Sequence, residues 1–147
     1  MDKQKFIATA QITINGSLEM VWDALVNPDV IKKYMFGTTV CSDWKVGSKI
    51  TWKGDWKGKT YEDKGEIKEV KPKEKLSYSH YSPLTGKSDI PENYHRVTVK
   101  LESVGKQTKV TLSQDNNASQ EDQKHSEENW ALMLSEMKKI LEKKAQK

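Results

Sequence analysis

Two histidines, His80 and His95, are the residues whose type and spacing favour chemistry most. They lie in alternating segments near residues 75–82 and 93–103, which we expect to pair as a hairpin. If the loop centres near Lys87 and Ser88, residue numbers that sum to about 175 face each other, so His80 lies opposite His95. Two neutral imidazoles that point inward can supply hydrogen bonds to a ligand carbonyl or hydroxyl.

Three interpretations of this histidine pair remain open. Ordinary sheet residues are the commonest case, polar lining of a pocket is the second, and metal binding or acid–base work is the third. A metal site lacks a third ligand, so we expect neither a metal nor a cofactor. His125 lies beside Glu121 and Glu128 at the start of the last helical segment and is predicted to be at the surface.

No catalytic signature accompanies the histidines. The sequence has no GxSxG, HExxH or CxxC motif, no glycine-rich phosphate loop and no EF-hand loop, and we assign no catalytic residue. Cys41 is the only cysteine, and a buried thiol is far commoner than a nucleophile. Because a single cysteine cannot form an intramolecular disulfide, a reducing compartment is favoured, and we expect a cytoplasmic protein.

Length and charge narrow the class of protein. The 147 residues fit one domain over 1–147, and the apolar 35% is strongly patterned, unlike a disordered chain. No apolar run approaches the about 18 residues of a membrane span, and the first residues show no signal pattern. The net charge is +4, but Arg96 is the only arginine and the lysines are scattered. This favours a solvated surface over a nucleic-acid partner.

The N-terminal segment predicts one strand and two short helices. Alternation predicts a strand over residues 6–14 whose inner face carries Phe6, Ala8, Ala10, Ile12 and Ile14. Ser17 is the expected N-cap of a helix with a buried stripe of Leu18, Val21, Trp22 and Leu25. Pro28 begins a second short helix, which ends at Gly37.

The remainder reads as strands followed by a long helix. Turn signals separate candidate strands near 48–56, 59–70, 75–82, 93–103 and 107–115, and such short connections favour antiparallel neighbours. Ser119 and Asp122 resemble a capping box. Apolar residues then recur at helical spacing: Trp130, Met133, Leu134, Met137, Ile140 and Leu141. This amphipathic helix must cover one face of the sheet, leaving either a dense core or a pocket beneath it.

The order of these segments resembles the START-like, pollen-allergen-like (SRPBCC) superfamily. It is most similar to the branch named after the C-terminal domain of the activator of the heat-shock protein 90 ATPase. The likeness spans roughly residues 6–143. The matching stretches are residues 12–14, Val-Trp-Asp-Ala-Leu at 21–25, Asn-Pro-Asp at 27–29 with an aromatic at Tyr34, Trp-Lys-Val-Gly at 44–47, Gly-Glu-Ile-Lys-Glu-Val-Lys-Pro at 65–72 running on to Leu76, Thr-Lys-Val-Thr-Leu at 108–112, and the terminal helix around Trp130.

The resemblance implies an α+β helix-grip fold. Its curved seven-stranded antiparallel sheet wraps around a long C-terminal helix, and two short helices follow the first strand. Members of the superfamily commonly keep a hydrophobic cavity for lipids, polyketides or flavonoid-like aromatics. This chain departs from the family at Tyr34, where tryptophan is frequent, and at Asn129, where glycine often precedes the helix tryptophan.

Three functions from different classes follow. The first is a carrier or sensor of a small hydrophobic ligand, for example in a stress response, by a monomer or weak dimer. The expected pocket lining is Trp52, Trp56, Tyr78, His80, His95, Val97, Trp130, Met133, Leu134 and Met137, with Trp22, Tyr34 and Phe36 at the entrance. The second is a co-chaperone-like module with a chaperone partner. The third is a polyketide cyclase or aromatase, for which only the histidines and Tyr78 could serve as acid–base groups.

Overall fold

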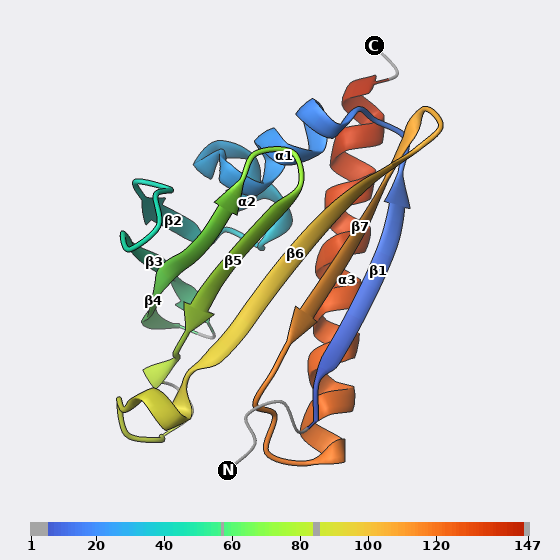
Figure 1. The fold of residues 1–147 in the computed structure, drawn as a ribbon. Coiled ribbons are helices and arrows are strands. Elements are labelled where there is room, and N and C mark those ends of the chain that lie inside the picture. Colours follow the sequence, from blue (N-terminus) through green and yellow to red (C-terminus); the bar gives the residue numbers. More distant parts are fainter. Residues whose placement is uncertain (1–5, 57, 84–85, 146–147) are drawn as a thin grey trace.

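One antiparallel sheet of seven strands dominates the part of the chain that the computed structural model describes, residues 6–56, 58–83 and 86–145. The spatial order is β1-β7-β6-β5-β4-β3-β2, so each strand from β2 to β7 pairs with its neighbour in sequence and β1 closes onto β7 (Figure 1). The strands are β1 (Ala8–Ile14), β2 (Thr39–Ser42), β3 (Lys49–Trp56), β4 (Lys59–Lys71), β5 (Lys75–His80), β6 (His95–Val104) and β7 (Gln107–Gln114).

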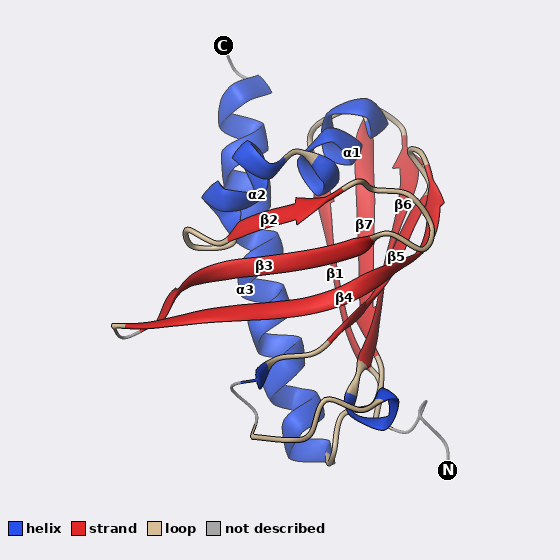
Figure 2. Ribbon diagram, turned by 90° about the vertical axis from the view of Figure 1, so that its left-hand side faces the viewer, coloured by secondary structure: helices blue, strands red, loops and turns tan. Residues whose placement is uncertain are grey.

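The sheet twists strongly from one edge to the other. In Figure 2 the strands β1 and β7 run nearly parallel to the long helix, whereas β3 and β4 cross the view almost at right angles to it. A right-handed twist accumulated over seven strands gives this curvature. The concave face therefore surrounds the helix on more than one side, as the helix-grip fold requires.

Each α-helix of the described residues begins where the sequence supplies a cap, whereas the short 3-10 helix at Pro91–Asn93 has no side-chain cap. The Ser17 hydroxyl accepts a hydrogen bond from the amide of Met20 at the start of α1 (Leu18–Val26). The Asn27 side chain accepts one from Asp29 at the start of α2 (Pro28–Tyr34), and the Ser119 hydroxyl caps α3 (Gln120–Ala145). Such caps satisfy amides that have no partner within the helix.

The long helix α3 is attached to the open edge of β1. Four of its side chains hydrogen-bond backbone groups on the side of β1 that faces away from β7: Gln123 to the Ile7 carbonyl (2.9 Å), Glu127 to the Thr9 amide (3.0 Å), Lys138 to the Thr13 carbonyl (2.7 Å) and Glu142 to the Asn15 amide (2.9 Å). At about 100° per residue, these four positions fall within about 100° of one another around the helix. These four hydrogen bonds fix the rotation of α3 about its axis and its position along β1.

The apolar face of α3 covers the inner face of β1, β6 and β7. Met133, Leu134, Met137 and Leu141 are all at most 7% exposed. They belong to one core that includes Val97 and residues of α1 and α2. At one end of α3 these two short helices close the space between it and the sheet (Figure 1).

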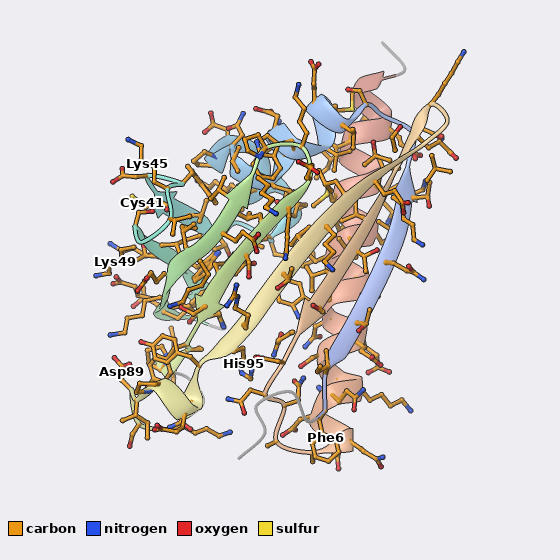
Figure 3. All side chains as sticks on the ribbon, in the orientation of Figure 1. Phe6, Cys41, Lys45, Lys49, Asp89 and His95 are labelled. Atoms are coloured by element: carbon orange, nitrogen blue, oxygen red, sulfur yellow. The ribbon has the colours of Figure 1, made fainter. Side chains whose placement is uncertain are left out.

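The predicted fold class is confirmed, and the predicted strands agree with those observed to within about two residues. Three local expectations differ. The first strand begins at Ala8 rather than Phe6, whose φ of 58° ends the extended run. Alternation in the sequence does not predict the four-residue strand β2, because Val40 is its only buried residue. Cys41, expected to be buried, lies exposed on that strand (Figure 3).

The attachment of α3 gives a first prediction. Replacing Glu142 with Ala should lower the free energy of unfolding by about 1 kcal/mol, because the Asn15 amide loses a charged acceptor. The matched control is Glu128→Ala, an exposed glutamate of the same helix, which should leave stability unchanged. Urea denaturation of both variants measures the difference. Equal losses would show that the edge contact contributes nothing.

Candidate functional site

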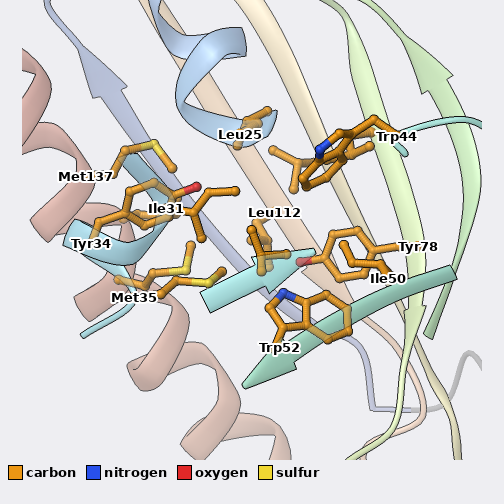
Figure 4. Close-up of a pocket in the computed structure, with 15 residues that line it drawn as sticks. Leu25, Ile31, Tyr34, Met35, Trp44, Ile50, Trp52, Tyr78, Leu112 and Met137 are labelled. Atoms are coloured by element: carbon orange, nitrogen blue, oxygen red, sulfur yellow. The ribbon is translucent and has the colours of Figure 1, made fainter. Parts of the chain in front are cut away.

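The core beneath α2 is almost completely filled. A cavity of about 30 Å³ remains among side chains from α1, α2, the inner face of the sheet and α3 (Figure 4). That volume holds about one water molecule and excludes an organic ligand. Leu134 and Met137 contact this small cavity, together with the buried Tyr34, whose hydroxyl donates to the carbonyl of Ala24 at 2.6 Å.

A second hollow opens to the surface between the N-terminal half of α3 and the strands β3 and β4. Its volume is about 450 Å³, within the range of small-molecule sites. We call it the aromatic pocket. Its lining residues are Met35, Phe36, Thr38, Trp52, Asp55, Tyr61, Asp63, Tyr78, His80, Gln114, Ser126, Asn129, Trp130 and Met133.

Aromatic side chains from three parts of the fold meet at this pocket: Phe36 after α2, Trp52, Tyr61 and Tyr78 on the sheet, and Trp130 on α3. The Trp52 and Tyr78 rings pack at 5.2 Å between centroids. The indole Nε1 of Trp130 donates to the Gln114 side chain at 2.5 Å. Locked aromatic rings present apolar area with little further loss of conformational freedom when a ligand binds.

A carboxylate lies among these rings. Asp63 of β4 faces Trp52 in the β3–β4 register, and its side chain is only 15% exposed. Its Oδ2 accepts a hydrogen bond from Nε2 of His80 at 2.9 Å, whereas Oδ1 is buried without a hydrogen-bond partner. Since buried carboxylate oxygens are normally paired, this unpaired oxygen marks Asp63 as a candidate ligand-binding group.

Gly65 allows β4 to pass close to β5 next to Asp63. A Cβ atom at this position would lie 1.7 Å from the carbonyl oxygen of Ser79, so only glycine fits. On one side of Gly65, Lys64 pairs with Tyr81 in an isolated bridge. On the other side, the register of β4 against β5 shifts between Ile67 and Glu69. This close approach brings Asp63 of β4 within hydrogen-bonding distance of His80 on β5.

The two histidines face each other across β5 and β6, as the residue sum predicts, with ring centroids 6.4 Å apart. His95 Nδ1 donates to the backbone carbonyl of Asp115 at 2.9 Å. Burial lowers the pKa of His95, so its imidazole is neutral at pH 7 and Nε2 is left as an acceptor. His95 does not line the aromatic pocket; both histidines line a smaller hollow of about 150 Å³ beside it.

Apart from His95, which lines the smaller hollow, the residues proposed from the sequence divide into three groups. Six line the aromatic pocket: Trp52, Tyr78, His80, Trp130, Met133 and the exposed Phe36. Others belong to or pack against the core: Val97, Leu134, Met137, Tyr34 and the half-buried Trp22. The side chain of Trp56 lies outside the described part of the structure.

Sequence reasoning missed Asp63 and Tyr61. The signal was available, because paired residues of β3 and β4 have numbers that sum to 115, which places Trp52 opposite Asp63. A carboxylate on an otherwise apolar inner face is the pattern that would have identified it.

A larger hollow of about 760 Å³ lies on the outer face of the sheet, over Ser79, Arg96 and Thr98. Its charged residues are largely paired with one another, as in the ion pair between Lys64 and Asp89. Tyr94 is the one tryptophan, tyrosine or phenylalanine among its described lining residues, against five in the aromatic pocket, so it has little of the aromatic lining typical of a small-molecule site. Among the described residues, no three metal-binding side chains lie close enough together to hold a metal ion. The helices of the described residues include none with the length and apolar character of a membrane span.

Comparison with known proteins agrees with this fold. The family model described as activator of Hsp90 ATPase homolog 1-like protein matches residues 15–142. The chain belongs to this family. No curated protein sequence matches the chain.

Three solved structures match this chain along nearly its whole length. The solution structure of ChR145 from Cytophaga hutchinsonii is 56% identical, covers 100% of both chains and has a TM-score of 0.86. The Aha1 dimer from Colwellia psychrerythraea is 23% identical, covers 92% of this chain and 95% of that one, and has a TM-score of 0.72. DynU16, from the dynemicin biosynthetic locus, is 14% identical over 97% of this chain and 48% of that one, with a TM-score of 0.77. The last two likenesses confirm the fold alone.

The neutral state of His95 gives a second prediction. Because burial places the folded-state pKa below the ordinary value of 6.5, stability is complete above that value and falls as the pH drops through the folded-state pKa. Replacing His95 with Asn keeps a donor for the Asp115 carbonyl but removes the titration. Between pH 7.5 and 5 the variant should therefore lose less stability than wild type.

Thermal unfolding at several pH values measures this effect, and His125→Asn, at an exposed histidine, is the matched control. The acids with lowered pKa values, such as Glu69 and Asp89, titrate below this window. Identical pH profiles for wild type and His95→Asn would contradict the assignment.

Proposed function

We propose that this protein binds a small hydrophobic or aromatic molecule in the aromatic pocket, as a carrier or sensor in a reducing compartment such as the cytoplasm. The observation that carries the proposal is the contrast between the two hollows. The core cavity of about 30 Å³ excludes a ligand, whereas the pocket of about 450 Å³ is lined by five aromatic side chains and opens to solvent. Family membership supports a ligand-binding fold.

The arrangement of the pocket explains how such a ligand would be held. Trp52 and Tyr78 form a rigid wall on the sheet, and Trp130 faces the pocket from α3. Burying apolar surface between these walls contributes about 25 cal/mol per Å². Polar groups at Thr38, Tyr61 and His80 would orient the ligand. The hydroxyls of Thr38 and Tyr61 share a hydrogen bond of 2.7 Å, which holds both side chains in place at the pocket.

Phe36 offers the sharpest test, because it lines the pocket yet is 65% exposed in the free protein. Replacing Phe36 with Ala should leave the thermal midpoint nearly unchanged but weaken binding of a neutral probe, 2-(1-naphthyl)ethanol. Loss of about 60 Å² of apolar contact is worth about 1.5 kcal/mol, which is roughly tenfold in Kd. Isothermal titration calorimetry measures the affinity.

Leu132→Ala is the matched control. Leu132 is 56% exposed on α3 and is not among the residues that line the pocket. This variant should bind the probe as wild type does. Equal affinities for all three proteins, or no binding by wild type to the naphthyl alcohol and to a panel of flavonoids and fatty acids, would contradict the proposed function.

A second candidate, contact with a chaperone ATPase, is supported by the description of the family model. The excess of 25 basic over 21 acidic residues would suit an acidic partner. Co-purification with the chaperone, and stimulation of its ATPase, would support this candidate independently of the Phe36 variant.

A further inference from the structure

The lining of the aromatic pocket carries acidic side chains but no basic ones other than His80. Among the described residues that line it are the carboxylates Asp55 and Asp63, and none is a lysine or an arginine. The whole chain nevertheless carries a net charge of +4, with 25 lysine and arginine residues. The local charge of the pocket is thus opposite in sign to that of the protein.

Asp63 is the more significant of the two carboxylates. Asp55 is exposed, so solvent and salt screen its charge. Asp63 has a side chain only 15% exposed, one oxygen bonded to His80 and one oxygen with no partner. Leaving a buried acceptor unpaired is unfavourable. Because this oxygen is itself covered, a hydrogen-bond donor on a ligand reaches it once the Asp63 side chain rotates toward the pocket, and the new bond then removes the penalty.

The aromatic rings reinforce the same preference. The face of a tryptophan, tyrosine or phenylalanine ring carries partial negative charge and attracts a cation within about 6 Å of the ring centroid. Trp52 lies opposite Asp63 in the register of β3 and β4, and the His80 ring that binds Asp63 packs edge-on against Trp52 at 5.0 Å. An ammonium group next to Asp63 would therefore meet both a carboxylate and aromatic rings.

We propose that the ligand of the aromatic pocket is an arylalkylamine, an aromatic ring that carries an aliphatic amine, whose protonated nitrogen contacts Asp63 while its ring system packs against Trp52 and Trp130. This inference rests on the proposed ligand-binding function and specifies its chemical class. An anionic ligand, such as a fatty acid, would instead place its carboxylate among Asp55 and Asp63 with no described lysine or arginine of the pocket to compensate it.

Three probes with the same naphthalene ring and different charges test the inference. At pH 7.5, 2-(1-naphthyl)ethylamine is a cation, 2-(1-naphthyl)ethanol is neutral and 1-naphthylacetate is an anion. Calorimetry on the wild-type protein should give an affinity for the amine at least about tenfold above that for the alcohol, with the anion weakest. Because the protein is positively charged overall, nonspecific attraction would give the opposite order.

Asp63→Asn should remove the preference by weakening the amine about tenfold while changing the alcohol by less than about threefold. Asp43→Asn, at an exposed carboxylate that does not line the pocket, is the matched control and should change the affinity for the amine by about twofold or less. Circular dichroism and thermal unfolding check that both variants fold. If Asp63→Asn does not fold, the order of the three probes on wild type still decides.

The outcomes separate the two proposals. Binding of the alcohol with equal or stronger binding of the anion overturns the amine inference and leaves the ligand-binding function standing. An amine preference that persists in Asp63→Asn also overturns the inference. Failure of all three probes to bind wild type overturns the amine inference, and failure of the flavonoids and fatty acids as well overturns both proposals.

Discussion

The attachment of α3 to the free edge of β1 is the constraint on which the rest of the structure depends. An edge strand exposes unpaired backbone groups that invite aggregation, and here side chains of the helix supply the partners. Glu127 and Glu142 accept from β1 amides, while Lys138 donates both to a β1 carbonyl and to Glu142. The hydrogen bond from Lys138, and then that from the Asn15 amide, lower the pKa of Glu142, so the contact remains charged at neutral pH.

Because α3 is held against one edge, it cannot cover the whole concave face. The inner surface of β1, β6 and β7 is filled by Met133, Leu134 and Met137. The surface of β3 to β5 curves past the helix, and α1 and α2 close only one end of the remaining space (Figure 2). The other end, near Trp130, is where the aromatic pocket opens. A pocket at this place follows from the geometry of a straight helix on a twisted sheet.

Much of the fold followed from the sequence because its signals are local. Ser17, Asn27 and Ser119 cap their helices, and turn residues gave the hairpins, including the pairing of His80 with His95. The site was less accessible to sequence reasoning. An aromatic or apolar residue that faces inward can belong either to a dense core or to a pocket. On α3, helical spacing alone does not distinguish Leu134, which is in the core, from Trp130, which lines the pocket. The choice depends on how far α3 extends past α2, which is a property of tertiary packing.

Asp63 shows the same dependence of the site on tertiary packing. Its position on β4 can be derived from the hairpin register, but its unpaired oxygen depends on the close approach of β4 to β5 at Gly65 and on the position of His80. Proteins retain such unfavourable groups where function requires them. We therefore propose that function lies at this carboxylate on the inner face of the sheet, beside the rings of Trp52 and Trp130.

The most direct test of a ligand site between α3 and the β3–β4 hairpin is an NMR measurement of intermolecular nuclear Overhauser effects with a bound naphthyl probe. If the ligand binds there, we expect cross-peaks from the probe to the rings of Phe36, Trp52 and Trp130. Cross-peaks confined to the core residues Leu134 and Met137, or to the outer face of the sheet around Arg96, would contradict it.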